Sequence, residues 1–87
     1  MKEAKIFSQL NGNIPSEFGN MSNLGFLDLS NNLLVGSIPT QLGSLNELYY
    51  IGLSNNMITG SIPNTFANLN SLQYIEMRGN NLIGEFP

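Results

Sequence analysis

Nine positions that could recognise a ligand recur along the chain in three columns, with 24 residues between neighbouring members of a column. The first column is aromatic, the second is acidic with a glycine in its middle, and the third is polar and ends in an arginine. In that order the columns are Phe26, Tyr50 and Tyr74; Asp28, Gly52 and Glu76; and Ser30, Ser54 and Arg78. Tyrosine combines apolar area with a hydroxyl group and is favoured at binding hot spots. These residue types suit contact with a peptide or protein.

Two of these columns have a second interpretation. Aromatic side chains also pair across neighbouring strands simply to stabilise a sheet. In the acidic column, Gly52 predicts a gap flanked by Asp28 and Glu76, with Arg78 beyond it, which makes a small polar site. The alternative for this site is a solvated face with a weak surface ion pair. Tyr49 directly precedes the second aromatic position and is expected to extend the patch.

Catalysis is not expected from these residues. Asp28 and Glu76 lie two repeats apart, so their separation is about 10 Å if neighbouring strands are ~4.8 Å apart. That is at or beyond the ~6.5–9.5 Å spacing of the carboxylates in inverting glycosidases. The chain contains no histidine and no cysteine, which removes the commonest acid/base group at neutral pH and the thiolate metal ligand. We therefore predict no enzyme, no catalytic residue, no metal and no cofactor.

The charge balance excludes further classes of partner. Six acidic and three basic residues give a net charge of −3, and Arg78 is the single cation outside the leading segment. A nucleic-acid binder needs a basic stripe to neutralise phosphates, and an anionic membrane surface also favours basic residues. No stretch approaches the ~20 apolar residues of a membrane span, and residues 1–7 lack the apolar run of a secretory signal. We expect neither nucleic-acid binding nor direct membrane contact.

The columns are positioned by a repeated skeleton, L-x-x-L-x-L-x-x-N-x-L-x-G-x-I-P. A fixed period of this length predicts a stacked array. We divide the chain into a non-repeat lead-in and an array over residues 8–87, with a partial copy at 8–23, full copies at 24–47 and 48–71, and a truncated copy at 72–87. Projecting the period back into the lead-in places Glu3 and Lys5 at the two apolar strand positions, and Ser8 at the asparagine position.

Each copy has the pattern of a strand followed by turns. Leu27 and Leu29 alternate with polar or aromatic residues, which predicts a half-buried strand that pairs in parallel with the next copy. The recurring asparagine then lies where the chain leaves the sheet, and a buried amide there can bond unpaired backbone groups. We expect a structural ladder of Asn32, Asn56 and Asn80. The glycine before Ile-Pro predicts a backbone conformation that is costly for other residues, and the segment after it predicts a short helical turn.

This skeleton resembles the leucine-rich repeat, and its G-x-I-P tail and 24-residue length resemble the plant-specific subclass found in receptor-like kinases, receptor-like proteins and polygalacturonase-inhibiting proteins. The resemblance implies an α/β solenoid with a parallel sheet on the concave face, second short strands near G-x-I-P, and short helical or 3-10 turns on the convex side. It further implies a non-catalytic recognition module, part of a receptor-type ectodomain, at the extracellular face of the plasma membrane or in the cell wall.

In such an array the ligand, a peptide, a protein or a co-receptor, is expected on the concave face. The candidate residues there are Phe26, Asp28, Tyr50, Ser54, Tyr74, Glu76 and Arg78. Asn20-Met21-Ser22 is a sequon, so Asn20 is a glycosylation candidate if the chain is secreted. Two other functions stay open: an inhibitor of a secreted pectin-degrading enzyme, and spacer repeats without a ligand. The resemblance also implies paired cysteines in the caps and a signal peptide, and this sequence has neither. The simplest explanation is that it is an internal piece of a longer receptor-type ectodomain or a shortened gene product.

Overall fold

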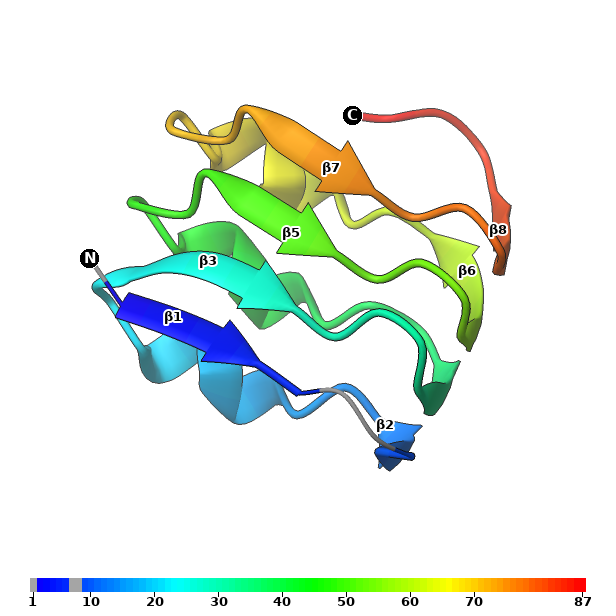
Figure 1. The fold of residues 1–87 in the computed structure, drawn as a ribbon. Coiled ribbons are helices and arrows are strands. Elements are labelled where there is room, and N and C mark those ends of the chain that lie inside the picture. Colours follow the sequence, from blue (N-terminus) through cyan, green and yellow to red (C-terminus); the bar gives the residue numbers. More distant parts are fainter. Residues whose placement is uncertain (1, 7–8) are drawn as a thin grey trace.

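A computed structural model describes residues 2–6 and 9–87. The chain forms a stack of four layers, and each layer contributes one strand to each of two parallel sheets (Figure 1). The N-terminus lies at one end of the stack and the C-terminal segment at the other (Figure 1). The stack is what the repeat predicts, and the second sheet is what the family resemblance implies.

The first sheet has the order β1-β3-β5-β7. Its strands are β1 (Lys2–Lys5), β3 (Leu24–Asp28), β5 (Tyr50–Gly52) and β7 (Tyr74–Glu76). From β3 onward the paired residues are those one period apart, such as Phe26 with Tyr50 and Tyr50 with Tyr74. We call the side of this sheet that carries the three columns the concave face.

The second sheet has the order β2-β4-β6-β8. Its strands are β2 (Asn11–Asn13), β4 (Leu33–Gly36), β6 (Met57–Ser61) and β8 (Asn81–Ile83). These are the second short strands expected near G-x-I-P. Gly36 and Gly60, which lie in β4 and β6, have φ of 77° and 81°, a region in which side chains with a Cβ are strained. The invariance of this glycine therefore has a backbone cause.

A 3-10 turn on the other side of the stack follows each Ile-Pro pair in the first three layers. These turns are η1 (Ser16–Asn20), η2 (Thr40–Ser44) and η3 (Asn64–Asn68). Successive turns are in close contact, because a Cβ added at Gly19 would lie 2.6 Å from the backbone oxygen of Gln41, and one added at Gly43 would lie 2.4 Å from Thr65. The turns set the layer spacing on this side of the molecule.

The core lies between the two sheets and the turns. The inward residues of β3 and β5, Leu27 and Ile51, are fully buried, as are Leu29 and Leu53 just beyond these strands. The last layer differs, because Ile75, one period after Ile51, is 36% exposed. The stack therefore presents apolar side chains at the β7 end.

The first layer corrects one expectation. β1 pairs in parallel with β3, but Ala4 lies opposite Leu27 and Lys5 opposite Asp28, with a register shift between Lys2 and Glu3. The offset is thus 23 residues in place of 24, and Ala4 packs against the core while Glu3 and Lys5 are exposed. Placing Glu3 and Lys5 at the inward positions was wrong. The copy boundaries themselves remain a prediction, and Ser8 lies outside the described residues.

Buried asparagines tie the layers together. Asn56 Nδ2 donates to the carbonyl oxygens of Leu53, at 3.1 Å, and of Leu29 in the preceding layer, at 3.0 Å. Its Oδ1 accepts from the amide of Leu34 at 3.0 Å. Asn32 and Asn80 make the corresponding bonds to their own layer and to the preceding one. Each amide therefore satisfies backbone groups of two layers at the point where the chain leaves the concave sheet.

Candidate ligand-binding face

The aromatic column is brought together on the concave face. Phe26 and Tyr50 stack with ring centroids 4.4 Å apart and 8° between the ring planes. Tyr49 also contacts Phe26, with its ring tilted by 54° and the centroids 6.0 Å apart. Tyr74 completes the column and is 59% exposed. The first three rings form a packed cluster, while Tyr74 offers most of its ring to a partner.

The acidic column does not contain the gap that the sequence predicts. A Cβ added at Gly52 would lie 2.7 Å from Asp28 Oδ1 and 2.9 Å from the hydroxyl oxygen of Tyr50. The space above Gly52 is therefore occupied by its neighbours, and Gly52 is buried. The physical reason is that a tyrosine side chain is long enough to reach across the residue two positions later on the same face. The polar site is a tyrosine hydroxyl between two carboxylates.

This arrangement perturbs Tyr50. Burial raises the pKa of the Tyr50 hydroxyl, and so do the negative charges of Asp28 and Glu76 and a hydrogen bond to the Glu76 side chain. Asp28 is held in place because its Oδ1 also accepts from the amide of Ser30 at 3.1 Å. The hydroxyl thus remains a neutral donor at neutral pH, fixed in the middle of the acidic column.

The third column is only partly available to a ligand. Arg78 is exposed, but Ser54 is 6% exposed and its Oγ has no hydrogen-bond partner. Ser30 Oγ accepts from the amide of Ser54 at 3.2 Å. The prediction that Ser54 lies on the ligand-binding surface is therefore wrong. Ser54 lies two residues beyond the end of β5 and is buried there.

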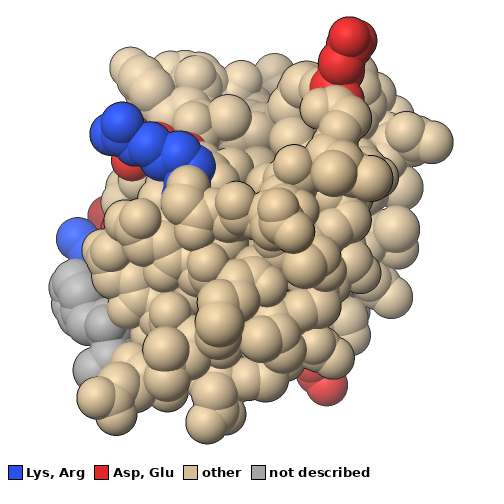
Figure 2. Space-filling view, turned by 90° about the vertical axis from the view of Figure 1, so that its right-hand side faces the viewer, with Lys and Arg blue, Asp and Glu red and all other residues tan. Residues whose placement is uncertain are grey.

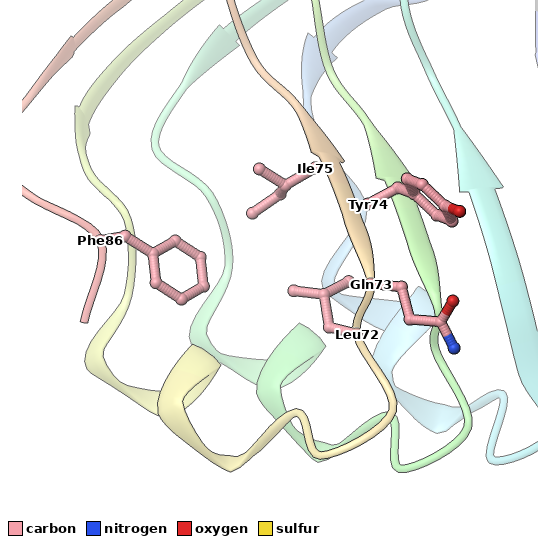
Figure 3. Close-up of a pocket in the computed structure, with 5 residues that line it drawn as sticks. All are labelled: Leu72, Gln73, Tyr74, Ile75 and Phe86. Carbon is pink, nitrogen blue, oxygen red and sulfur yellow. The ribbon is translucent and has the colours of Figure 1, made fainter.

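Two hollows adjoin the concave face and were missed from the sequence. One, of about 590 Å³, is lined by Glu47, Tyr49, Asn70, Ser71, Leu72 and Gln73. The other, of about 260 Å³, lies at the β7 end and is lined by Leu72, Gln73, Tyr74, Ile75 and Phe86 (Figure 3). Both include Leu72 and Gln73, which directly precede β7. The repeated skeleton places Leu72 but does not indicate a hollow beside it. Two residues singled out from the sequence line them: Tyr49 lines the larger hollow and Tyr74 the smaller one.

A further surface was also missed. Figure 2 looks onto the side of the molecule on which the second sheet lies, and charged side chains are confined to its margins. Leu33, Val35, Met57 and Ile83 of that sheet are exposed there. Alternation along β4, β6 and β8 could have indicated this surface. It is a neutral, partly apolar side of the stack.

The remaining observations concern metal-binding groups, membrane-spanning helices and the sequon in the described part of the chain. Residues 2–6 and 9–87 contain no group of three or more acidic side chains that could hold a metal ion. None of the helices in these ranges has the length and hydropathy of a membrane span. Asn20, the sequon asparagine, is exposed at the end of η1. Its side chain is therefore accessible to a glycosylating enzyme.

Comparison with known proteins gives a family and several solved relatives. The family model described as "Leucine rich repeat" matches residues 22–82. No match is found among curated proteins. The BIR2 ectodomain from Arabidopsis thaliana superposes with a TM-score of 0.86 and 40% identity, over 92% of this chain and 43% of that chain.

Two other structures extend the comparison. The Arabidopsis receptor kinase HAESA, solved with the peptide hormone IDA and the co-receptor SERK1, matches with a TM-score of 0.89 and 37% identity, over 97% of this chain and 14% of that chain. A plant ice-binding protein matches with a TM-score of 0.80 and 39% identity, over 85% of this chain and 24% of that chain. The present chain thus spans less than half the length of each relative.

Proposed function

Because the chain belongs to the leucine-rich-repeat family, we propose that it serves as a non-catalytic recognition module whose concave face binds a peptide or protein ligand. The observation that carries this proposal is the aromatic column. Phe26 and Tyr50 form a rigid stack, and Tyr74 continues it with most of its ring exposed. A preorganised aromatic surface beside fixed polar groups is the usual composition of a binding hot spot.

The solved relatives support a peptide or co-receptor as the partner. HAESA is solved with a peptide hormone and a co-receptor, and its matched region is 37% identical to this chain. The plant ice-binding protein shares the same scaffold at similar identity, so the scaffold alone does not determine the ligand. The proposal therefore depends on the residues of the concave face and not on the fold.

We place the chain within a plant receptor-type ectodomain, at the extracellular face of the plasma membrane or in the cell wall. The BIR2 ectodomain is 40% identical to this chain over 92% of its length, which supports this placement. In that setting Asn20, which is exposed at the end of η1, would carry a glycan. Expression through the secretory pathway of a plant cell, followed by a mass measurement of wild type and Asn20→Gln, tests whether Asn20 is glycosylated.

The binding experiment uses peptides selected from a display library against the wild-type chain. The Tyr50→Ala/Tyr74→Ala double variant should bind them at least about tenfold more weakly, as expected for hot-spot tyrosines. Thr59→Ala is the matched control, because Thr59 is exposed on the second sheet. Unchanged affinity in the double variant, with its circular dichroism spectrum intact, would refute the concave-face assignment.

A further inference from the structure

The larger of the two hollows lies where the chain enters the concave sheet. Its volume is about 590 Å³, which is within the range of about 300–1,000 Å³ that ligand pockets occupy. One wall is formed by Glu47 and Tyr49, which precede β5, and the other by residues 70–73, which precede β7. We call this space the Glu47 hollow.

The Glu47 hollow belongs to two consecutive layers of the stack. β5 and β7 are neighbours in the concave sheet, and the amides of Gln73 and Tyr74 donate to the carbonyl of Tyr49 at 2.9 Å and 3.0 Å. The two walls are therefore held together by backbone hydrogen bonds. Repeats of a solenoid contact only their neighbours, so a layer beyond β7 would pack on the side of residues 70–73 that faces away from Glu47. The hollow would therefore remain in a longer array.

The hollow adjoins the aromatic column. Tyr49 lines it, and the ring of Tyr49 also contacts Phe26 of the column, with the centroids 6.0 Å apart. On the other wall, Gln73 directly precedes the exposed Tyr74. Figure 3 shows the side chains of Gln73 and Tyr74 on the same side of β7, opposite to that of Ile75. A peptide that lies over Tyr74 therefore has the hollow directly beside it.

The lining of the hollow combines neutral polar groups with one negative charge. Asn70, Ser71 and Gln73 supply side-chain oxygens, and Glu47 supplies a carboxylate, whereas no lysine or arginine of the described residues lines the space. Glu47 is exposed, and no other residue in the described ranges forms an ion pair with it. Arg78 lies beyond the opposite end of β7. The charge of the hollow therefore complements a cationic group.

An arginine side chain matches this lining better than a lysine. Its guanidinium group is planar, carries five donors and stacks on aromatic faces, whereas the lysine ammonium is a compact and strongly hydrated charge. The ring of Tyr49 supplies an aromatic surface in the same hollow as the Glu47 carboxylate, and a cation is attracted to such a ring. Because Glu47 and Gln73 stand on opposite walls, their oxygens can accept from different edges of one planar group. A glutamate or aspartate would instead be repelled by Glu47.

We propose that the Glu47 hollow holds an arginine side chain of the bound peptide, next to the residue of the peptide that contacts Tyr74. This inference rests on the proposed function and deepens it, since it assigns the module a preference for one residue type at one position. Glu47 is the specificity-determining residue, and Tyr49 supplies the surface on which the guanidinium group stacks.

The test uses peptides selected from a display library against the wild-type chain. Arginine next to an aromatic or apolar residue should be enriched among them. Each selected peptide is then synthesised in three forms, with arginine, with lysine and with citrulline, which has nearly the shape of arginine but no charge. At low salt the citrulline form should bind about threefold to tenfold more weakly than the arginine form, and the difference should shrink as salt is added. The lysine form should fall between them.

Variants of the protein locate the arginine. Glu47→Gln should weaken binding of the arginine form about threefold and leave that of the citrulline form unchanged, because only a charged partner loses an interaction. Glu17→Gln is the matched control, since Glu17 is exposed in η1 and undergoes the same change of charge. It should alter neither affinity. Glu76→Gln tests the acidic column as the alternative place for the cation.

The outcomes separate this inference from the proposed function. Selected peptides without enriched arginine would overturn the inference, and so would equal losses for the arginine and citrulline forms in Glu47→Gln. A dependence on Glu76 in place of Glu47 would also overturn it, while peptide recognition by the concave face would stand. Conversely, unchanged binding in Tyr50→Ala/Tyr74→Ala would refute the concave-face assignment, and the coupling between Glu47 and the arginine would still be measured on its own.

Discussion

The hydroxyl group of Tyr50 lies over Gly52, two residues later on the same face of β5. The same side chain stacks on Phe26 of the preceding strand and hydrogen-bonds to Glu76 of the following strand. Tyr50 thus connects β3, β5 and β7 of the concave sheet. The absence of a side chain at Gly52 is what permits this arrangement.

Replacing Gly52 should displace Tyr50. In Gly52→Ala the new methyl would lie within 3 Å of both Asp28 Oδ1 and the Tyr50 hydroxyl oxygen, so at least one of them must move. We expect the free energy of unfolding to fall by about 1–3 kcal/mol, as for overpacked sites. Urea unfolding monitored by circular dichroism measures this change. In a Tyr50→Ala background the cost should shrink, because one of the two obstacles is gone. An equal cost in both backgrounds would contradict the account.

The raised pKa of Tyr50 predicts a loss of stability at high pH. The folded state holds the phenolic proton more tightly than the unfolded state, for which the pKa is about 10. The corresponding stability is therefore fully present below about pH 10, and it is lost as the pH rises through the folded-state pKa. The ultraviolet absorbance of the phenolate, compared between wild type and Tyr50→Phe, isolates this group.

Glu76→Gln supplies the control for that titration. It removes one of the two charges and the charged hydrogen-bond partner that raise the pKa of Tyr50, so the pKa should move back toward its ordinary value. Burial is the largest cause and remains in the variant. The return should therefore be partial. An unchanged Tyr50 titration in Glu76→Gln would show that the carboxylate does not act on the hydroxyl.

The sequence predicted the features that depend on one repeat, and it failed where neighbouring side chains decide the outcome. Alternation at Leu27 and Leu29 was enough to predict the strand and its buried face. The burial of Ser54 and the filled space over Gly52 could not be read from alternation, because they depend on how far side chains of the same face reach. In the first layer, Ala4 and Ile6 alternate with charged residues, but an irregularity near Lys2 moves them out of the 24-residue register.

Two serines one period apart should respond oppositely to the same substitution. Ser54 Oγ is buried without a hydrogen-bond partner, so Ser54→Ala removes a desolvated hydroxyl group. It should leave the free energy of unfolding unchanged, or raise it by up to about 1 kcal/mol. Ser30 Oγ accepts from the amide of Ser54, so Ser30→Ala leaves that amide unpaired and should lower stability by about 1 kcal/mol. Urea unfolding of both variants measures these free energies. A Ser30→Ala variant more stable than Ser54→Ala would contradict the prediction.

The turns offer a similar comparison between Gly43 and Ala67, which are equivalent positions in successive layers. A Cβ at Gly43 would lie 2.4 Å from Thr65 of the next turn, whereas Ala67 is exposed and already carries its methyl group. Alanine is the better residue for a helical turn by up to about 1 kcal/mol, so propensity alone predicts that Gly43→Ala stabilises. Overpacking costs about 1–3 kcal/mol. This cost should exceed the gain from helix propensity, so the net effect of Gly43→Ala should be destabilising.

We therefore expect Gly43→Ala to unfold at a lower urea concentration than wild type. The matched variant Ala67→Gly changes the same two residue types without affecting a contact between turns, so it should cost no more than about 1 kcal/mol. Thr65→Gly removes the side-chain obstacle, although it also removes the 2.8 Å bond that Thr65 Oγ1 donates to Thr40. In that background the cost of Gly43→Ala should decrease. If Gly43→Ala were as stable as wild type, layer spacing would not depend on this glycine.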